Sequence, residues 1–310
     1  MWPFTKKPTL DPTFGDEEAQ AFQAAVRSGD WRATRDLLAA TGDTNRRSTY
    51  LGLLTAGNPS WIAEWIAAEP DSAPAQLVKG VTMTQWAWEA RTARLAKDVS
   101  SEQFATFFRR LKLAEDALDA ALARDPKEAL AWSALITTSM GRQLGLEESR
   151  RRFEQAAAIE RWHGPAHFTL LNQLHQKWSG VQDAALDFAR ETVAAMPPGS
   201  RLGAMIPIAH FERALRSGDD GYFKRPDVIA DVHAAAEKSV LHPGFERGLG
   251  AQGSHGWFAI VALGAGNWAG AAWHFDAIGD TPAEYPWGYY GNAAKVYARR
   301  RAEAYSYAGR

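Results

Sequence analysis

The chain has 310 residues, of which 46% are hydrophobic, and this composition excludes a chain that is disordered throughout. With 35 basic and 36 acidic residues there is no excess positive charge to attract a nucleic-acid backbone, so we expect no nucleic-acid partner. Cysteine is absent, which excludes disulfides and zinc–thiolate sites and is consistent with the cytoplasm. The longest apolar run, 257–266, is too short for the ~20 residues of a membrane span, so we expect a soluble protein with no membrane partner.

Residues 1–15 are rich in proline and show little periodicity, which predicts a mobile N-terminal arm. No continuous apolar stretch follows Lys6 and Lys7, so the arm does not resemble a secretory signal. Its Trp2 and Phe4 have two possible docking surfaces, the protein's own body or a partner, and we favour the former.

From residue 16 onward the pattern is helical, with good helix formers throughout and no alternating segment that predicts a strand. The expected class is therefore all-α, built from antiparallel helix pairs. The expected helices are 17–28 with 31–41, 45–56 with 59–68, 73–96 with 103–123, 128–143 with 147–160, 165–178 with 182–195, 201–216 with 227–240, 254–265 with 268–278, and a closing helix at 287–306.

Similar corners recur between the expected helices. Residues 28–31 read Ser-Gly-Asp-Trp and residues 265–268 read Ala-Gly-Asn-Trp, where Gly ends one helix and Asp or Asn caps the next. This recurrence predicts internal repeats over 16–240. Residues 241–310 are expected to form a C-terminal unit with a Gly-rich loop, ending in a capping helix whose Arg299, Arg300 and Arg301 give it a charged outer face.

The small and bulky residues of the second helices resemble those of the tetratricopeptide superfamily. Ala114, Leu118, Ala121 and Pro126 match that family's small, bulky, small and terminating positions. Partial matches are Ser149, Phe153 and Ala156, then Ala184 with Phe188, and Ala271 with Phe275. The resemblance implies an α-solenoid, with irregular units because their lengths vary. His242-Pro243, His255, His274-Phe275 and Pro286-Trp287 also resemble a family of uncharacterised bacterial helical proteins, which implies no known activity.

On the tetratricopeptide register, the first helices of the pairs line a concave face that grips a peptide or protein partner. The residues expected on that face are Ser133, Thr137, Thr169, Gln173, Gln176 and Lys177. They are polar without being strongly charged, which argues against the basic carboxylate clamp of some members of that superfamily. The first hypothesis is therefore an intracellular binding scaffold.

A second hypothesis places a small-molecule site or an enzyme site in the Gly-rich segment 242–256 and its surroundings. The glycines 248, 250 and 253 spell a dinucleotide-binding fingerprint, but no strand precedes them, so we reject that interpretation. Ser254 is expected to cap the helix that follows, where free amides and Arg247 would bind a carboxylate or phosphate. A capped helix after a flexible loop is the simpler alternative.

Three histidines of this region, His242, His255 and His274, are expected either to converge for acid–base chemistry or to be packing residues. The aromatic run from Tyr285 to Tyr290 either walls a pocket or seals the end of the chain. The residues of this second candidate site are His242, Arg247, Ser254, His255, Trp257, His274 and Trp287.

No motif predicts catalysis or a cofactor. His163 and His167 have helical spacing, but Gly164 and Pro165 lie between them, so we expect no metal there. No nucleophile motif or phosphate-binding loop is present, and acidic pairs such as Glu147-Glu148 are explained by helix capping. A binding protein is therefore favoured over an enzyme, and a self-associating structural subunit is a third hypothesis.

Overall fold

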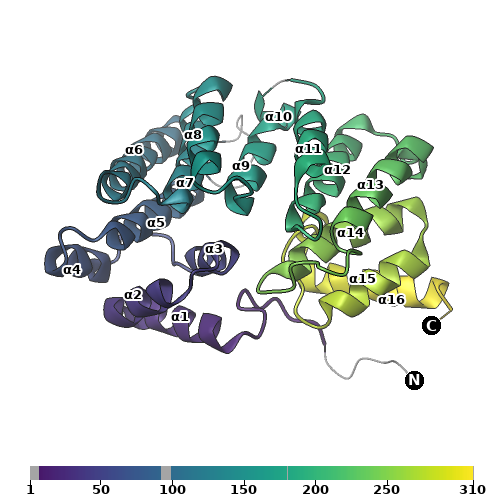
Figure 1. The fold of residues 1–310 in the computed structure, drawn as a ribbon, viewed down its shortest axis with the longest axis horizontal. Coiled ribbons are helices and arrows are strands. Elements are labelled where there is room, and N and C mark those ends of the chain that lie inside the picture. The colour runs from purple at the N-terminus through teal and green to yellow at the C-terminus, as the bar shows by residue number, and fades with distance from the viewer. Residues whose placement is uncertain (1–6, 92–98, 180, 310) are drawn as a thin grey trace. The chain divides into compact units, whose positions relative to one another are not determined.

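The computed structural model describes residues 7–91, 99–179 and 181–309 (Figure 1). Within these ranges the chain forms sixteen α-helices and no strand, which confirms the all-α prediction. None of the described helices is long and apolar enough to cross a membrane. The chain divides into two compact units, which are described separately below.

The N-terminal unit is Glu17–Leu174. Its helices are α1 (Glu17–Ser28), α2 (Trp31–Ala40), α3 (Thr44–Gly52), α4 (Ser60–Ala68), α5 (Ala73–Arg91), α6 (Ser101–Arg124), α7 (Ala129–Arg142), α8 (Leu146–Ile159) and α9 (Gly164–Leu174). The expected continuation of α5 to residue 96 lies outside the described residues.

The C-terminal unit comprises His175–Arg310 together with the described part of Met1–Asp16. Its helices are α10 (Gln176–Ser179), α11 (Ala184–Ala195), α12 (Met205–Ser217), α13 (Pro226–Lys238), α14 (Ala251–Ala265), α15 (Trp268–Ile278) and α16 (Ala293–Tyr307), with short 3₁₀ turns η2 (Arg201–Ala204), η3 (Tyr222–Lys224) and η4 (Trp287–Tyr290). The boundary therefore falls after Leu174, whereas the expected boundary at 240/241 lies inside this unit.

The described part of the N-terminal arm belongs to the C-terminal unit. The Thr9 amide donates to the Asp280 carbonyl at 3.1 Å, and Pro8 is buried. Residues 7–16 are thus docked on the protein itself. The expected mobility of the first residues, and the placement of Trp2 and Phe4, lie outside the described residues.

The corners predicted from sequence have the expected chemistry. Gly29 and Gly266 adopt φ of 73° and 77°, the left-handed conformation in which glycine carries no Cβ penalty. Asp30 then accepts a hydrogen bond from the Ala33 amide at the start of α2, and Asn267 accepts one from the Gly270 amide at the start of α15.

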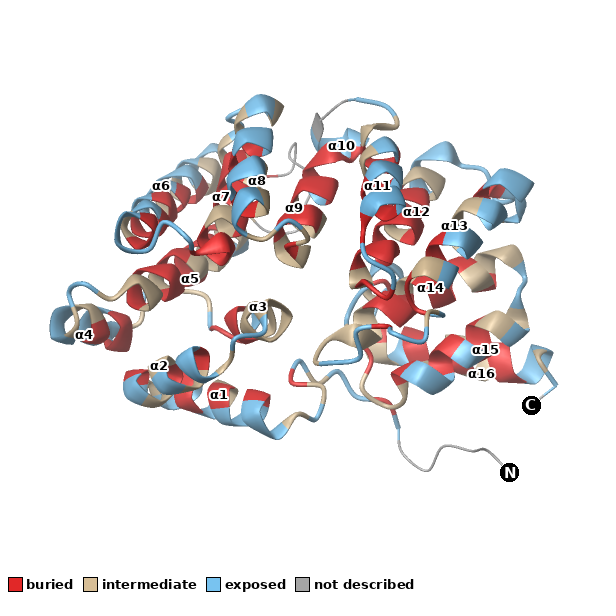
Figure 2. Ribbon diagram, in the orientation of Figure 1, coloured by how far each residue is buried: buried red, intermediate tan, exposed pale blue. Residues whose placement is uncertain are grey.

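Small residues bring the central helices of the N-terminal unit together. A Cβ on Gly80 of α5 would lie 2.5 Å from Leu118 Cγ of α6, so only glycine permits this approach. Ala114, Leu118 and Ala121, which carried the tetratricopeptide resemblance, are completely buried, and Ala114 and Leu118 lie at this contact. Figure 2 shows red, buried segments recurring along α5 and α7 of this unit.

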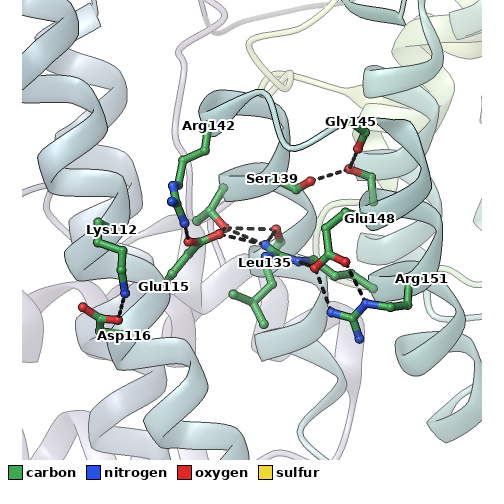
Figure 3. Close-up of polar contacts among 12 residues, drawn as sticks. Lys112, Glu115, Asp116, Leu135, Ser139, Arg142, Gly145, Glu148 and Arg151 are labelled. Carbon is green, nitrogen blue, oxygen red and sulfur yellow. Dashed lines mark hydrogen bonds and ion pairs between the residues drawn. The ribbon is translucent and has the colours of Figure 1, made fainter.

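A buried ion-pair network joins α6, α7 and α8. Glu115 is 4% exposed and accepts hydrogen bonds from Thr138 Oγ1 and Arg152 Nη1, each at 3.0 Å. Arg142 also pairs with Glu115, and Figure 3 shows its side chain reaching the carboxylate. Arg152 Nε donates to Glu148 at 2.6 Å. The two carboxylates and two guanidinium groups that these three helices contribute therefore neutralise one another inside this unit.

In the C-terminal unit, α14, α15 and α16 share one aromatic core. Phe275 stacks on Trp287 with ring centroids 5.4 Å apart, and Tyr297 meets both rings edge to face. The expected charged outer face of the closing helix is wrong at Arg301, which is 5% exposed and donates to the Gly279 carbonyl and Asp280. It fixes the turn that follows α15.

Candidate functional site

The six residues expected on a concave face are divided between the two units. Ser133 and Gln173 are buried, at 5% and 7% exposure, and Thr137 and Thr169 are half-buried. Thr169 Oγ1 donates to the Pro165 carbonyl within α9. These four residues of the N-terminal unit are largely engaged in packing. Gln176 and Lys177, on α10 of the C-terminal unit, are exposed.

Lys177 belongs to a polar cluster that connects three elements of the C-terminal unit. Its Nζ donates to Glu212 Oε1 on α12 at 2.5 Å. The same oxygen accepts a hydrogen bond from Tyr289 Oη of η4, also at 2.5 Å. Glu212 is 5% exposed, so a buried carboxylate fixes one lysine and one tyrosine that both reach the surface.

The charges of this cluster follow from its contacts. Burial raises the pKa of Glu212, but the hydrogen bonds from Lys177 and Tyr289 outweigh it and hold the pKa below its usual range. Burial and the bond to Glu212 raise the pKa of Tyr289. His175 is buried beside Glu212, and burial lowers its pKa to about 4. At neutral pH the cluster thus holds an ionised Glu212, a protonated Tyr289 and a neutral His175.

Tyr289 also belongs to a group of three exposed tyrosines, and we call Tyr285, Tyr289 and Tyr290 the tyrosine face. They are 52%, 41% and 44% exposed. Tyr289 and Tyr290 meet buried Phe211 edge to face at 5.0 and 6.1 Å, and Tyr285 meets Tyr289 at 5.4 Å. Half-buried Trp257 completes the arrangement, 6.2 Å from Tyr289. Large aromatic rings are therefore held in fixed positions at the surface.

Sequence reasoning found the tyrosines and Lys177 but not Glu212, which connects them. One local signal was present. Met205, Ala209 and Glu212 follow the i, i+4, i+7 spacing of the buried stripe of α12, so a carboxylate occupies a position that normally holds an apolar residue. A charge on a buried stripe needs a partner, and the partner is Lys177.

The Gly-rich segment of the second candidate site is fixed in place. Its backbone crosses the loop before η2 so closely that a Cβ on Gly199 would lie 2.2 Å from the Gly244 carbonyl oxygen. Arg201 donates from Nε to the Glu246 carbonyl at 2.9 Å and from Nη1 to the Leu249 carbonyl at 2.7 Å. His242 Nδ1 accepts from the Gly244 amide. These bonds tie the segment to η2 and to its own backbone.

The expected N-cap at Ser254 is wrong. Helix α14 begins at Ala251 after Gly250, whose φ of 84° turns the chain into the helix. Ser254 is consequently inside the helix and 7% exposed, away from the free amides of the first turn. Arg247 lies in the loop and is exposed. The expected pairing of Ser254 and Arg247 around an anion at a helix start has no counterpart in this geometry.

Two histidines of the second candidate site do meet. His255 of α14 and His274 of α15 are each 7% exposed, and their Nδ1 atoms lie 3.1 Å apart. Burial lowers the pKa of His255 to about 4, with Arg247 adding to the effect, and burial beside His255 lowers the pKa of His274 to about 3. Both imidazoles are therefore neutral at pH 7, and one Nδ1 donates to the other.

The tryptophans of the second candidate site lie elsewhere. Trp287 is 1% exposed and stacks on Phe275 in the core. Trp257 contacts Phe211 at 5.4 Å beside the tyrosine face. The seven residues therefore do not form a single site.

The remaining buried histidines have structural partners. His163 Nδ1 accepts the Ala166 amide at the start of α9, and His167 Nδ1 contacts the His163 carbonyl. His210 contacts Tyr222 Oη through Nδ1 at 2.8 Å and Asp231 through Nε2 at 3.0 Å. Among the described residues no group of three or more His, Cys, Asp and Glu side chains is arranged to hold a metal ion.

An open cleft of about 800 Å³ lies in the N-terminal unit, between the α1–α2 corner and the loop before α4. Backbone and exposed polar side chains form most of its wall, and Val26 and Trp61 are its buried lining residues. Arg27 and Glu64 are its charged lining residues. It lacks the convergent buried polar groups that fix the orientation of a ligand.

No family model matches the chain, and no curated protein matches it significantly. The function therefore has to be argued from the geometry of the tyrosine face and its surroundings.

Proposed function

We propose that this protein is a helical binding protein that recognises a segment of another protein through the tyrosine face of its C-terminal unit. The observation that carries the proposal is the simultaneous exposure and fixation of Tyr285, Tyr289 and Tyr290. Large aromatic side chains that remain exposed in a cluster are typical of interaction sites, whereas single exposed apolar residues are ordinary. These three are 41–52% exposed although buried Phe211 packs against two of them.

Pre-organisation is the physical reason to expect useful affinity. Immobilising a side chain on binding costs about 0.5–1.5 kcal/mol, and a ring already held in place avoids most of that cost. Tyr289 is held twice, by edge-to-face contact with Phe211 and by its hydrogen bond to Glu212. Tyrosine also offers a hydroxyl for hydrogen bonding, which is why it is enriched at binding hot spots.

The proposal retains part of the hypothesis drawn from sequence. Gln176 and Lys177 belong to it, since Lys177 shares Glu212 with Tyr289. The buried Ser133 and Gln173 do not. A tetratricopeptide-like arrangement of the helix pairs and a cytoplasmic location remain parts of the proposal, supported by the small-and-bulky residue pattern and by the absence of cysteine.

The test is photo-crosslinking followed by affinity measurement. A benzophenone amino acid placed at position 285 is expected to crosslink one defined protein in the native cells. The same probe at position 307 is the control, because Tyr307 is 69% exposed but stacks on Trp268 away from the tyrosine face. It is expected to give no such product.

The affinity of each variant for the purified partner then tests the proposal. We expect Tyr285→Ala and Tyr290→Ala each to weaken its binding about tenfold or more, the effect of losing a hot-spot side chain, and Tyr307→Ala to leave it unchanged. Equal affinities for all three variants, or no crosslink at position 285, would contradict the proposal.

A further inference from the structure

Two hydroxyl groups of the tyrosine face have no hydrogen-bond partner among the described residues. They are Oη of Tyr285 and Oη of Tyr290, whose side chains are 52% and 44% exposed, whereas Tyr289 Oη donates to Glu212. Lys177 Nζ, which carries three N–H groups, also donates to Glu212, and that carboxylate is itself buried. The face therefore presents spare donors, which a ligand rich in acceptors would satisfy.

The rings of the face are steeply inclined to one another. Tyr285 stands at 71° and Trp257 at 70° to the ring of Tyr289, with centroids 5.4 and 6.2 Å from it. Rings at such angles do not stack on one another, so the faces of the exposed rings stay open to a ligand. Because the face of an aromatic ring is electron-rich, it attracts electron-poor C–H groups such as those beside an amide nitrogen in the ring of proline.

The carboxylate of Glu284 lies beside these rings. Glu284 is exposed, and no described residue forms an ion pair with it. The position that a Cβ on Gly288 would take is 3.7 Å from both Glu284 Oε1 and Tyr285 Cε1, so the carboxylate adjoins the tyrosine ring. The edge of the tyrosine face therefore carries an unpaired negative charge, which is complementary to a lysine or arginine of the ligand.

Three common kinds of protein segment fit this surface poorly. An added β-strand needs a sheet edge, and the described part of the chain contains no strand. A phosphorylated or acidic segment needs unpaired basic groups, but Lys177 is paired with Glu212. Arg300, which interacts electrostatically with Tyr290, is likewise paired, with Glu303. An amphipathic helix bonds its backbone carbonyls internally, so it would cover the tyrosine hydroxyls without accepting from them.

We infer, on the basis of the proposed function, that the tyrosine face recognises a proline-rich segment in the polyproline II conformation with a lysine or arginine beside its prolines. That conformation has no internal hydrogen bonds, so its carbonyls accept from the free hydroxyls of Tyr285 and Tyr290. Proline has no N–H group, so few donors of the ligand are left unsatisfied. The proline rings pack on the tyrosine rings, and the basic side chain pairs with Glu284. Because the segment is stiff, little entropy is lost when it is bound.

The experiment is binding of the purified full chain to an array of synthetic peptides. The array compares proline-rich peptides flanked by arginine, the same peptides flanked by glutamate, amphipathic helical peptides and phosphoserine peptides. We expect the proline-rich peptides to be retained, and the arginine-flanked ones to bind about fivefold more tightly than the glutamate-flanked ones, the contribution of an exposed ion pair. Replacing their prolines by alanine is expected to abolish retention.

Variants at the surface of the protein test each contact. Glu284→Gln should remove the preference for arginine, whereas the control Glu237→Gln, at an exposed carboxylate of α13, should keep it. Tyr290→Phe, which removes only a hydroxyl, is expected to weaken binding of the proline-rich peptides about fivefold. Tyr285→Ala, which removes a whole ring, is expected to weaken it about tenfold or more.

The outcomes separate this inference from the proposed function. If the wild type retains helical or phosphoserine peptides in preference to proline-rich ones, and Tyr285→Ala releases them, the inference is overturned while the tyrosine face remains the binding site. An arginine preference that persists in Glu284→Gln would overturn the assigned role of that carboxylate. If no peptide is retained, or if the tyrosine variants bind the proline-rich peptides as tightly as the wild type, the inference fails together with the binding site on which it rests.

Discussion

Glu115 shows how much one buried carboxylate can contribute in this protein. At 4% exposure it pairs with Arg142 and Arg152, so its removal would leave Arg152, itself 8% exposed, with a buried charge and Glu148 as its remaining charged partner. Breaking a buried pair in this way costs about 3–5 kcal/mol. We therefore expect Glu115→Ala to lower the free energy of unfolding by about that amount, measured by urea denaturation.

The neighbouring residue supplies the control. Asp116 pairs with Lys112 on the exposed side of the same helix, where both side chains are more than half exposed. Such surface pairs contribute about 0–1 kcal/mol, so Asp116→Ala should change little. Similar losses in the two variants would show that the Glu115 network does not have the stabilising role assigned to it.

At the scale of elements, close contact between helices depends on single glycines. Gly203 of η2 packs on α13, and an added Cβ would lie 2.3 Å from Ser239 Cβ and 3.1 Å from the Ala235 carbonyl oxygen. The backbone there cannot yield without moving α13. We expect Gly203→Ala to destabilise the protein by about 1–3 kcal/mol, the usual result of overpacking, measured as a loss of thermal or urea stability.

Gly52, the last residue of α3, is the matched control, because nothing lies within 4 Å of the position that an added Cβ would take and its φ is not positive. There the same substitution restricts the unfolded chain and is expected to be neutral or to stabilise by about 0.4–1 kcal/mol. A Gly203→Ala variant as stable as Gly52→Ala would refute the close contact.

Helix positions could be predicted from sequence because their signals are local. Caps such as Asp30 and Asn267, and the glycines before them, lie within a few residues of the helix ends that they specify. The failures are local too. The expected helix 165–178 ends at Leu174 and restarts as α10, and the closing helix begins only at Ala293, because Gly291 adopts a φ of 121°. An isolated glycine does not reveal this from sequence.

The polar clusters could not be predicted in the same way, because their members are far apart in the chain. Glu212 lies 35 residues from Lys177 and 77 from Tyr289, and no local periodicity connects them. His255 and His274 are 19 residues apart on two consecutive helices that were expected to pair. Their convergence was therefore one of the two alternatives that the sequence offered. Sequence thus located candidate residues, whereas packing decided which ones meet.

At the scale of the whole molecule, buried histidines make both units sensitive to acid. Burial lowers the pKa of His163 in the N-terminal unit, and of His175 and His255 in the C-terminal unit, from 6.5 to about 4. Below pH 6.5 these histidines become protonated in the unfolded chain, whereas in the folded chain they stay neutral until the pH approaches 4. The stability from these neutral histidines is therefore complete above pH 6.5 and is lost as the pH falls towards 4. Each can contribute up to about 3 kcal/mol.

The stabilising carboxylates titrate at lower pH than these histidines, so the effect of the histidines on stability can be measured separately. Glu148, whose pKa is lowered to about 2 mainly by the hydrogen bond from Arg151, loses its stabilising effect only below its ordinary value of 4.5. We therefore expect urea midpoints to decline between pH 6.5 and 4.5, before any carboxylate of this kind is protonated. His175→Phe should flatten the decline, while His233→Gln, at an exposed position, should leave its slope as in the wild type. A midpoint that stays constant down to pH 4.5 would mean that these histidines are hydrated in solution, and the packing that excludes water from them in both units would have to be revised.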